Sequence, residues 1–541
     1  MITVSNGWKA VQNQTLLPET FIEITYNVTE PGVQQDAVTT GNYPESYSNA
    51  SQLVRTTEKD TVAYASLDYG IWGLDGAFSY SDGSPENPGY IDTNYSNDSC
   101  SFDVSPYPTI TIDFSKRHDG LIPGITITWS KSFKCWATSF RVTAYDSSGV
   151  IASKTVTGNE SVVTHVWIDL VNYSKITVEI LEWSHPHHRV RCNDIRLGIE
   201  SVYVKSDLMS FEHSQSVDML SAVLPDSSVK FALRNDDGRW NPNNPTGSEK
   251  YLLEQQEVRV RYGMDINGVT EWIKCGTFWL NEWETPSNGL EADFTAKDAF
   301  SLMNVAYTGI RSGTLYDIAV AAFAEAELPI MDDGSERYIV DESLKQYETD
   351  FSEDTSEYII SEVIQMVAHA AGCVLYQDRD GMVHIEPRAK DYSHYMIEPQ
   401  ISYAYPEYTI NKPLKAISVE YGEEFKADVA VHPRGEVQTI STPFINTRED
   451  ALRIAEVARE VLENREVITG DFRADLRMDA LDNIVVVSKY ASNTICVTDV
   501  KYSTTGGAFK GTYTGRVTSV IMDEEQLYSG DLYVGEVSLW N

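Results

Sequence analysis

Apolar and polar residues alternate with a period of two in many short stretches of this chain, and Pro-Gly or Ser-Ser-Gly turns separate several of them. The clearest stretches are 21–28, 109–114, 125–129, 140–145, 163–168 and 176–180. Alternation places successive side chains on opposite faces of a strand, and short strands with turns between them are typical of an antiparallel sandwich. The pattern predicts a mainly β chain with a sandwich in the region 45–200.

A segment after this region combines strand and loop signals in an unusual order. The alternating stretch 229–233 stops at Asn235-Asp236-Asp237-Gly238, Trp240 follows, and a loop rich in Pro, Asn and Gly leads to a second alternating stretch, 258–262. Glycine accepts a positive φ and proline lacks an N–H donor, so these residues end strands. On the pattern alone, the segment is equally well a long connection between two strands of an ordinary sandwich.

The centre of the chain changes to the helical period. Thr314 precedes a stretch whose apolar residues share one helix face and which ends near Leu328-Pro329. A second helix is predicted from Thr355 to Gly372, where a glycine suits the C-terminal cap. Asp378-Arg379-Asp380-Gly381 then predicts a hairpin turn. The remaining predicted elements are a helix at 447–464 and strands at 417–421, 483–489, 494–502 and 511–520.

Several of these segments resemble a known family. FALRNDDGRWNPNNPTGSEKYLLEQQEVRVRYG and GTFWLNEW, followed by GCVLYQDRDGMVHIEP, ALDNIVVVSKY and GAFKGTYTGRV, look like the tail-tip hub proteins of bacteriophages. Within 45–200, the order DFS, PGITITWS, FRVTAYDSSG and RCNDIRLGIE resembles the galactose-binding-like jelly roll of carbohydrate-binding modules. The resemblance implies a mainly β fold with a smaller α/β part, made of hub-type β-barrels and an inserted jelly-roll β-sandwich.

The order of these segments predicts a domain division. Because strand patterns precede and follow the sandwich, the simplest topology inserts it into the first barrel, as loop tips permit. Two domains in series is the alternative. The predicted units are 1–44 with 201–300 (first barrel, discontinuous), 45–200 (sandwich), 301–400 (small α/β domain) and 401–541 (second barrel with one helix and a C-terminal extension).

The net charge of −38 narrows the classes of partner. A field this negative repels nucleic acid and anionic membrane surfaces, so uncharged glycans, cations and other protein subunits remain. The six cysteines are scattered without CxxC spacing, which argues against a disulfide scaffold and predicts reduced thiols. The start of the chain lacks the features of a signal peptide. No apolar run reaches 18 residues, so the sequence predicts no membrane span.

Catalytic motifs are not found in the sequence. It contains no GxSxG, HExxH or GxxxxGK[ST] pattern. His185, His187 and His188 cluster, but without an evident carboxylate or thiol partner they are interpreted as polar surface. Asp236-Asp237-Gly238 and Asp332-Asp333-Gly334 lack calcium-loop spacing. A structural Ca²⁺ in the sandwich is implied only by the resemblance, and no other cofactor is expected.

Recognition of a sugar is the chemistry that the sandwich sequence suggests. Sugars stack on aromatic rings, while amide and carboxylate groups bond their hydroxyls. The same residues also suit a sandwich core or a subunit contact. The candidate glycan-binding residues are Tyr69, Trp72, Tyr80, Tyr90, Tyr95, Trp136, Asp82 and Asn94, with Asp75, Asn87 and Asn97 interleaved.

The resemblance implies a structural, non-enzymatic protein of the virion, made in the host cytoplasm and placed at the distal tip of the tail. It implies a homotrimeric ring that closes or continues the tail tube and contacts the distal tail ring, tube, tape measure and fibres. The sandwich would contact a host cell-wall polysaccharide. Two alternatives remain: a hexameric distal tail protein with a carbohydrate-binding module, and a cell-wall glycoside hydrolase with a binding module. After the last predicted strand, 521–541 is too short for the peptidoglycan-degrading domain that many hubs carry.

Overall fold

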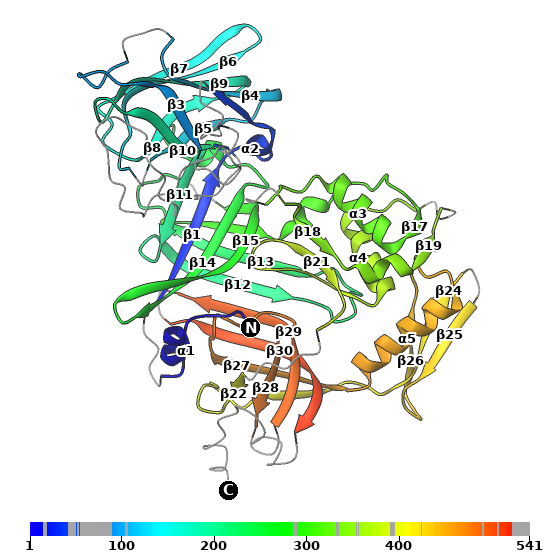
Figure 1. The fold of residues 1–541 in the computed structure, drawn as a ribbon. Helices are drawn as coiled ribbons and strands as arrows, with labels where there is room; N and C mark the ends of the chain where they lie inside the picture. The colour runs from blue at the N-terminus through cyan, green and yellow to red at the C-terminus, as the bar shows by residue number, and fades with distance from the viewer. Residues whose placement is uncertain are drawn as a thin grey trace, which may run out of the picture.

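The computed structural model describes residues 1–521 except 15–18, 42–49, 51–52, 55–88, 103–105, 131–132, 285–288, 332–334, 353, 355, 390–394, 423–424, 489–491 and 506–507. Strands dominate the described part (Figure 1), which confirms the prediction of a mainly β chain with a smaller α/β part. No helix in the described ranges is long and apolar enough to cross a membrane.

The largest element is a sheet of 13 strands, here called the long sheet. Eleven of them form one path in the order β11-β1-β14-β15-β16-β13-β12-β29-β30-β27-β23, and every neighbouring pair on this path is antiparallel. The strands are β11 Ile199–Val204, β1 Thr20–Val28, β14 Glu257–Ile266, β15 Val269–Glu284, β16 Glu291–Lys297, β13 Asp226–Arg234, β12 Leu208–Ser216, β29 Ser492–Thr504, β30 Lys510–Ile521, β27 Glu466–Arg473 and β23 Glu407–Ile410. As far as the described residues go, the path is open rather than closed into two separate barrels.

Two stretches of chain far apart in sequence join within this sheet. Strands β11 to β12 of the path form its N-terminal half-sheet, and β29 to β23 form its C-terminal half-sheet. The two meet where β12 pairs with β29, from Phe211 beside Thr504 to Ser216 beside Asp499. Strand β28 (Asn483–Val487), with β22 (Met396–Ile397) beside it, pairs with the other part of β29. One apolar core containing Phe294, Tyr262 and Tyr502 runs under both half-sheets.

The segment that carries the hub resemblance connects β13 to β14. These strands are not neighbours, because β16 and β15 lie between them in the sheet. The connection therefore spans β16 and β15, as the long connection of a Greek key spans the strands between its ends. Trp240 anchors it: the indole is buried beside Phe294, with ring centroids 5.2 Å apart, and its backbone N–H donates to Asn235 Oδ1 over 2.9 Å.

The sandwich consists of two sheets with a core of their own. One sheet has the order β3-β10-β5-β8 and the other β2-β4-β9-β6-β7. Trp129 and Trp183 meet edge to face in this core, with centroids 5.7 Å apart. The strands are β2 Val38–Gly41, β3 Tyr90–Tyr95, β4 Thr109–His118, β5 Ile122–Trp129, β6 Ala137–Asp146, β7 Gly149–Thr157, β8 Val163–Leu170, β9 Tyr173–Trp183 and β10 Arg189–Leu197.

The chain leaves the long sheet after β1 and returns to it in β11. Strand β1 pairs with β11 on one side and with β14 on the other, so the sandwich sequence lies between two neighbouring strands. In Figure 1 the sandwich stands at one end of the molecule, beyond β1 and β11. Asp169, near the end of β8, connects the sandwich to the segment between β13 and β14, here called the hub loop. Its carboxylate accepts hydrogen bonds from the Tyr251 hydroxyl (2.5 Å) and the Lys250 ammonium (3.0 Å). The predicted domain limits themselves stay a prediction.

A small α/β part packs beside the long sheet. Helices α3 (Leu315–Ala326) and α4 (Ile360–Ala371) lie near the three-stranded sheet β18-β21-β20, and α5 (Arg448–Leu462) contacts β24 and β25 of a second small sheet, β25-β24-β26. The remaining elements are α1 Asn6–Gln12, α2 Val33–Asp36, β17 Ser312–Thr314, β18 Tyr338–Val340, β19 Glu348–Asp350, β20 Val374–Gln377, β21 Val383–Glu386, β24 Leu414–Tyr421, β25 Phe425–Ala430, β26 Glu436–Ile440, and the 3₁₀ turns Glu249–Tyr251, Ala299–Met303 and Glu342–Gln346.

Arg379, in the turn between β20 and β21, ties this part to both half-sheets. Its guanidinium donates to the Asp479 carboxylate at 2.9 and 2.8 Å, to the Lys274 carbonyl at 2.7 Å and to the Leu476 carbonyl at 2.8 Å. A buried guanidinium with this many partners fixes the relative position of the three segments.

Candidate binding surface

Strand β3 carries three of the candidate glycan-binding residues. Tyr90 at its start is fully buried, and its hydroxyl donates to the Asp92 carboxylate. Asp92 also accepts the Asn94 backbone N–H over 2.7 Å, while burial raises the pKa of the Asp92 carboxyl. Tyr90 is therefore a core residue, and the expectation that it forms part of a surface platform is not met.

Tyr95 at the end of β3 is exposed and lies beside Arg189 on β10. The guanidinium carbon stands 4.6 Å from the centre of the Tyr95 ring, and Nη2 donates to the Tyr95 hydroxyl over 2.6 Å. A cation over a ring is attracted by the negative face of the π system. The guanidinium therefore covers one face of the exposed Tyr95 ring. Asn94, also exposed, precedes it.

Trp136 is half-buried and lies across a short loop from Tyr95. The indole N–H donates to the Asn159 carbonyl over 3.0 Å, and the backbone N–H donates to Ser184 Oγ, also over 3.0 Å. The His185 ring stands edge-on to the indole at 6.5 Å. The Ser96 hydroxyl, next to Tyr95, donates to the His185 carbonyl over 2.7 Å. The loop 184–188 thus lies between Tyr95 and Trp136.

The structure brings three candidates to one end of the sandwich: Asn94, Tyr95 and Trp136. Tyr69, Trp72, Tyr80 and Asp82 lie outside the described residues. The sequence analysis did not single out Arg189 as part of this surface. Arg189 lies on β10 and pairs in register with Tyr95 on β3. The alternation of polar and apolar residues along β10 is the sequence signal that could have identified it.

The histidine loop differs in one respect from the sequence interpretation. His187 has a carboxylate partner, with its Nε2 2.8 Å from Asp98 Oδ1. The rings of His185 and His188 lie 5.1 Å apart, and burial, then the neighbouring His188, lowers the pKa of His185. In the described ranges no three His, Cys, Asp or Glu side chains gather to hold a metal ion. The Ca²⁺ implied by the resemblance stays a prediction.

A histidine and a cysteine meet in the core under the long sheet. His213 Nδ1 lies 2.9 Å from the Tyr262 hydroxyl and 3.5 Å from Cys275 Sγ. Burial lowers the pKa of His213 to about 3 and raises that of Cys275 to about 12. Both groups are neutral near pH 7 and closed off from solvent, so they form a polar patch of the core and not an activated nucleophile.

One cavity, here called the larger cavity, lies where the two half-sheets and the β20–β21 turn meet. It has a volume of about 260 Å³, and five aspartates line it: Asp226, Asp298, Asp378, Asp380 and Asp479. Most of these carboxylates already have structural partners. Asp479 binds Arg379, Asp380 pairs with Lys274, and Asp378 accepts the N–H groups of its own turn.

The Asp298 carboxyl differs from these carboxylates in its protonation state. It is buried and accepts the Ser227 N–H over 2.6 Å. Burial raises the pKa of its carboxyl to about 8, so the group is largely protonated at neutral pH. A raised carboxyl pKa in a cavity is a feature of general acids as well as of buried structural residues.

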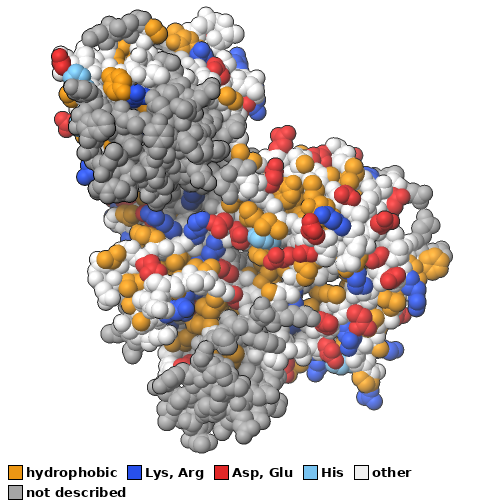
Figure 2. Space-filling model, viewed as in Figure 1, with side chains coloured by type: hydrophobic (Ala, Val, Ile, Leu, Met, Phe, Trp, Pro, Cys, Tyr) orange, Lys and Arg blue, Asp and Glu red, His pale blue; other side chains and the backbone are white. Residues whose placement is uncertain are grey.

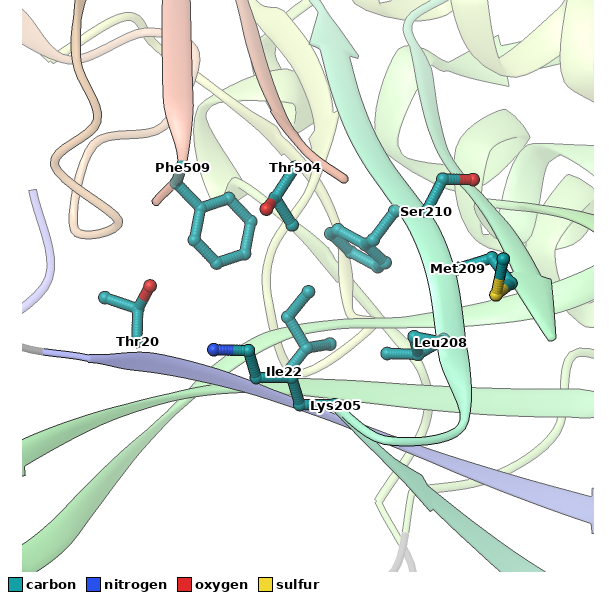
Figure 3. A pocket seen from close by; sticks show the side chains of 9 residues that line it. Thr20, Ile22, Lys205, Leu208, Met209, Ser210, Thr504 and Phe509 are labelled. Atoms are coloured by element: carbon teal, nitrogen blue, oxygen red, sulfur yellow. The ribbon is translucent and has the colours of Figure 1, made fainter. Parts of the chain in front are cut away.

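The second recess is small and apolar (Figure 3). Ile22, Leu208 and Phe509 line it, with Lys205 at its side, and the Ser210 side chain points away from its centre. Its volume of about 20 Å³ is room for a single water. On the visible face of the molecule, acidic, basic and hydrophobic side chains are interspersed (Figure 2), so the negative net charge does not form one acidic patch there.

Comparison with known proteins gives matches among solved structures only. No family model matches the sequence, and no curated protein matches it. The 43 kDa tail protein of prophage MuSo2 from Shewanella oneidensis is 14% identical; the match covers 58% of this chain and 94% of that chain, with a TM-score of 0.39. A tail protein from Neisseria meningitidis is 8% identical over 59% of this chain and 94% of that one, with a TM-score of 0.41.

A chain of the phage P2 baseplate in its activated conformation is 7% identical, with 62% of this chain and 94% of that chain covered and a TM-score of 0.25. These three solved structures are named as tail or baseplate proteins. At such identities and TM-scores the likeness by itself assigns no function to this chain.

Proposed function

We propose that this chain is a structural hub subunit at the distal end of a bacteriophage tail, and that its sandwich faces outward to contact the host cell wall. One observation carries the proposal. The sandwich, with its own core, leaves and rejoins the long sheet between β1 and β11, two strands that pair with each other. A sheet that continues past such a module suits a scaffold that holds a recognition domain.

The proposed assembly is a homotrimeric ring that closes or continues the tail tube. A ring made by rotation needs two different contact surfaces on each subunit, and the open long sheet ends in two different strands, β11 and β23. The partners proposed for the ring are the distal tail ring, the tube, the tape measure and the fibres. A hexameric distal tail protein with a carbohydrate-binding module is the nearest alternative.

For the sandwich we propose contact with a wall polysaccharide through Tyr95, Asn94 and Trp136. The exposed Tyr95 ring would stack on a sugar, and the Asn94 amide would bond its hydroxyls. The proposed role is adhesive and not catalytic. What supports this is that Asp378, Asp380 and Asp479 in the larger cavity are engaged in holding the segments together.

The proposed location is the tip of the virion tail, after synthesis in the host cytoplasm. The similar solved structures are named as tail and baseplate proteins. Their names agree with this location but are not the basis of the proposal. No contact with nucleic acid or membrane is proposed, because the net charge of −38 opposes both.

Two measurements on the purified full chain test the proposal. Light scattering should give the mass of three chains, whereas six chains would favour the distal tail protein. Sedimentation with purified host cell wall should show binding without release of soluble sugar fragments. Release of fragments would favour the glycoside hydrolase, with Asp298 as the first candidate for a general acid.

A further inference from the structure

The two ends of the eleven-strand path are edge strands with unusual side chains. Within the described residues, β11 has a strand partner only in β1, and β23 only in β27. All four residues of β23 are exposed, among them Tyr408 and Ile410. Tyr403 and Tyr405, just before this strand, are exposed as well. Proteins normally protect edge strands with charges, bulges or covering loops, so an apolar edge of this kind favours contact with another chain.

The register of the sheet defines the faces on which these side chains lie. Tyr408 stands beside Ile468, which is buried in the core, so Tyr408 and Ile410 are on the core face of the sheet. At the other end, Tyr203 stands beside the buried Ile24, again on the core face.

The alternate residues at both ends lie on the opposite face. Val202 and Val204 of β11 are exposed there, as is Thr409 of β23. The β23 edge thus presents the exposed core-face side chains Tyr408 and Ile410, whereas Tyr203 of β11 is buried. The outer faces carry Val202, Val204 and Thr409, and also the acidic Glu200 and Glu407.

The sheet itself contains a precedent for joining two parts edge to edge. Among the strand pairings of the described residues, β12 with β29 joins the N-terminal and C-terminal half-sheets, and the core face is continuous across this contact. His213 and Tyr502 are directly opposite there, and both are buried. Edge pairing is therefore already the way in which this sheet is extended.

We propose that the long sheet continues from one copy of the chain to the next, with β23 of one subunit beside β11 of its neighbour. The inference rests on the proposed ring and names its contact surfaces. The path has eleven strands and every neighbouring pair is antiparallel, so the two end strands run in the same direction. Rotation about an axis lined by the sheet keeps this direction, and the meeting strands are therefore parallel.

Side-chain chemistry selects one register for this contact. Placing Val204 beside Thr409 puts Tyr203 next to Tyr408 on the core face and Val202 next to Glu407. A shift by two residues would place Glu200 beside Glu407, and like charges opposite each other destabilise a pair of strands. The charges in and next to β11 have partners within the subunit: Glu200 pairs with Arg196, and Lys205 with Glu19.

Disulfide trapping in the full chain tests the contact. Val204→Cys and Thr409→Cys in one chain should give covalent oligomers on a non-reducing gel, up to the size of the closed ring. The matched control is Val202→Cys with Thr409→Cys. In the proposed register these two positions are about 7 Å apart along the strands as well as on different strands, which is too far for a disulfide, so this pair should remain uncoupled.

A charge substitution gives a second readout that needs no oxidation. Ile410→Lys should weaken assembly about tenfold or more in dissociation constant, because it would bury an unpaired cation on the apolar core face of the contact. Phe425→Lys is the control: Phe425 is 64% exposed and Ile410 62%, but Phe425 lies on β25 of another sheet. The control should assemble as the parent does.

The outcomes separate this inference from the proposed function. An oligomer that forms but gives no Val204–Thr409 link and tolerates Ile410→Lys would overturn the edge contact while leaving the ring intact. Linkage only through Val202 and Thr409 would contradict the parallel register. A chain that stays monomeric at every concentration tested would overturn both the ring and this contact.

Discussion

At the scale of single residues, several aspartates of this chain hold parts of the fold together. Asp169 holds the sandwich to the hub loop, and Asp479 and Arg379 hold the β20–β21 turn against both half-sheets. Asp298 is a buried acid of a different kind, because it is largely protonated near neutral pH and has the Ser227 N–H as its donor. Its role can be tested through the pH dependence of stability.

The pKa of about 8 of the Asp298 carboxyl in the folded protein lies above the ordinary aspartate value of 3.8. Its protonated form therefore contributes stability in full below pH 3.8, and this contribution is lost as pH rises toward 8. Asp298→Asn keeps an acceptor for Ser227 but does not ionise. The variant should therefore lose less stability between pH 5 and pH 8 than the parent, by up to about 4 kcal/mol, because one pKa unit corresponds to about 1.4 kcal/mol. Urea unfolding measures this difference. An unchanged pH slope would mean that Asp298 is ionised in the folded protein.

Tyr95 is the residue on which the proposed adhesive surface most depends. Tyr95→Ala should weaken binding to purified host cell wall about tenfold, because a stacking contact of roughly 1–1.5 kcal/mol is lost. Trp167→Ala is the control, since Trp167 is 47% exposed and Tyr95 43%, and it lies on β8 at the opposite edge of the same sheet. Equal loss in both variants, or none in either, would remove Tyr95 from the binding surface.

At the scale of elements, short-range signals predicted local structure well. The Thr314 cap is present: its hydroxyl accepts the Asp317 N–H over 3.1 Å and α3 follows. Gly372 adopts the left-handed conformation that ends α4, and Thr447 caps α5. The start of α4 was predicted too early, since α4 begins at Ile360 and not at Thr355. Glu362 accepts the Ile359 N–H there over 3.1 Å, a signal that the apolar stripe obscured.

Long-range pairing was beyond what the sequence pattern could predict. Alternation identifies strands but contains no information on partners, so the contact of β12 with β29 and the separation of β13 from β14 were not expected. Helix α1 was also missed, because its seven residues are too few for a periodic signal, although Ser5 caps it and Trp8 is buried. For the binding surface, aromatic type suggested both Tyr90 and Tyr95, but only tertiary packing separates the buried ring from the exposed one.

The hub loop between β13 and β14 depends on one side chain. Trp240 is buried against Phe294, so Trp240→Ala should destabilise the chain by about 3–5 kcal/mol through the cavity it leaves. Chemical unfolding followed by tryptophan fluorescence and circular dichroism measures this loss. Trp167→Ala, an exposed site, should change stability by roughly 0.5 kcal/mol or less. A small effect at Trp240 would mean that the loop does not depend on this anchor.

At the scale of the whole molecule, the long sheet is a continuous support and the sandwich is a module fixed at one end of it (Figure 1). Buried and half-buried contacts hold the module in place, including Glu30 and Asp36 on either side of His118, at 3.1 and 2.9 Å. A module attached in this way has a defined direction relative to the sheet. In a ring, every copy would therefore present its Tyr95 surface at the same angle to the axis.

The most direct test of this account is electron microscopy of the purified full-length protein. The account predicts a three-fold ring with a central opening, its wall formed by the long sheets and three sandwich lobes at its periphery. Monomeric particles, or a closed dimer in which the two copies bury the same surface, would contradict the proposal that this chain is a ring-forming hub subunit.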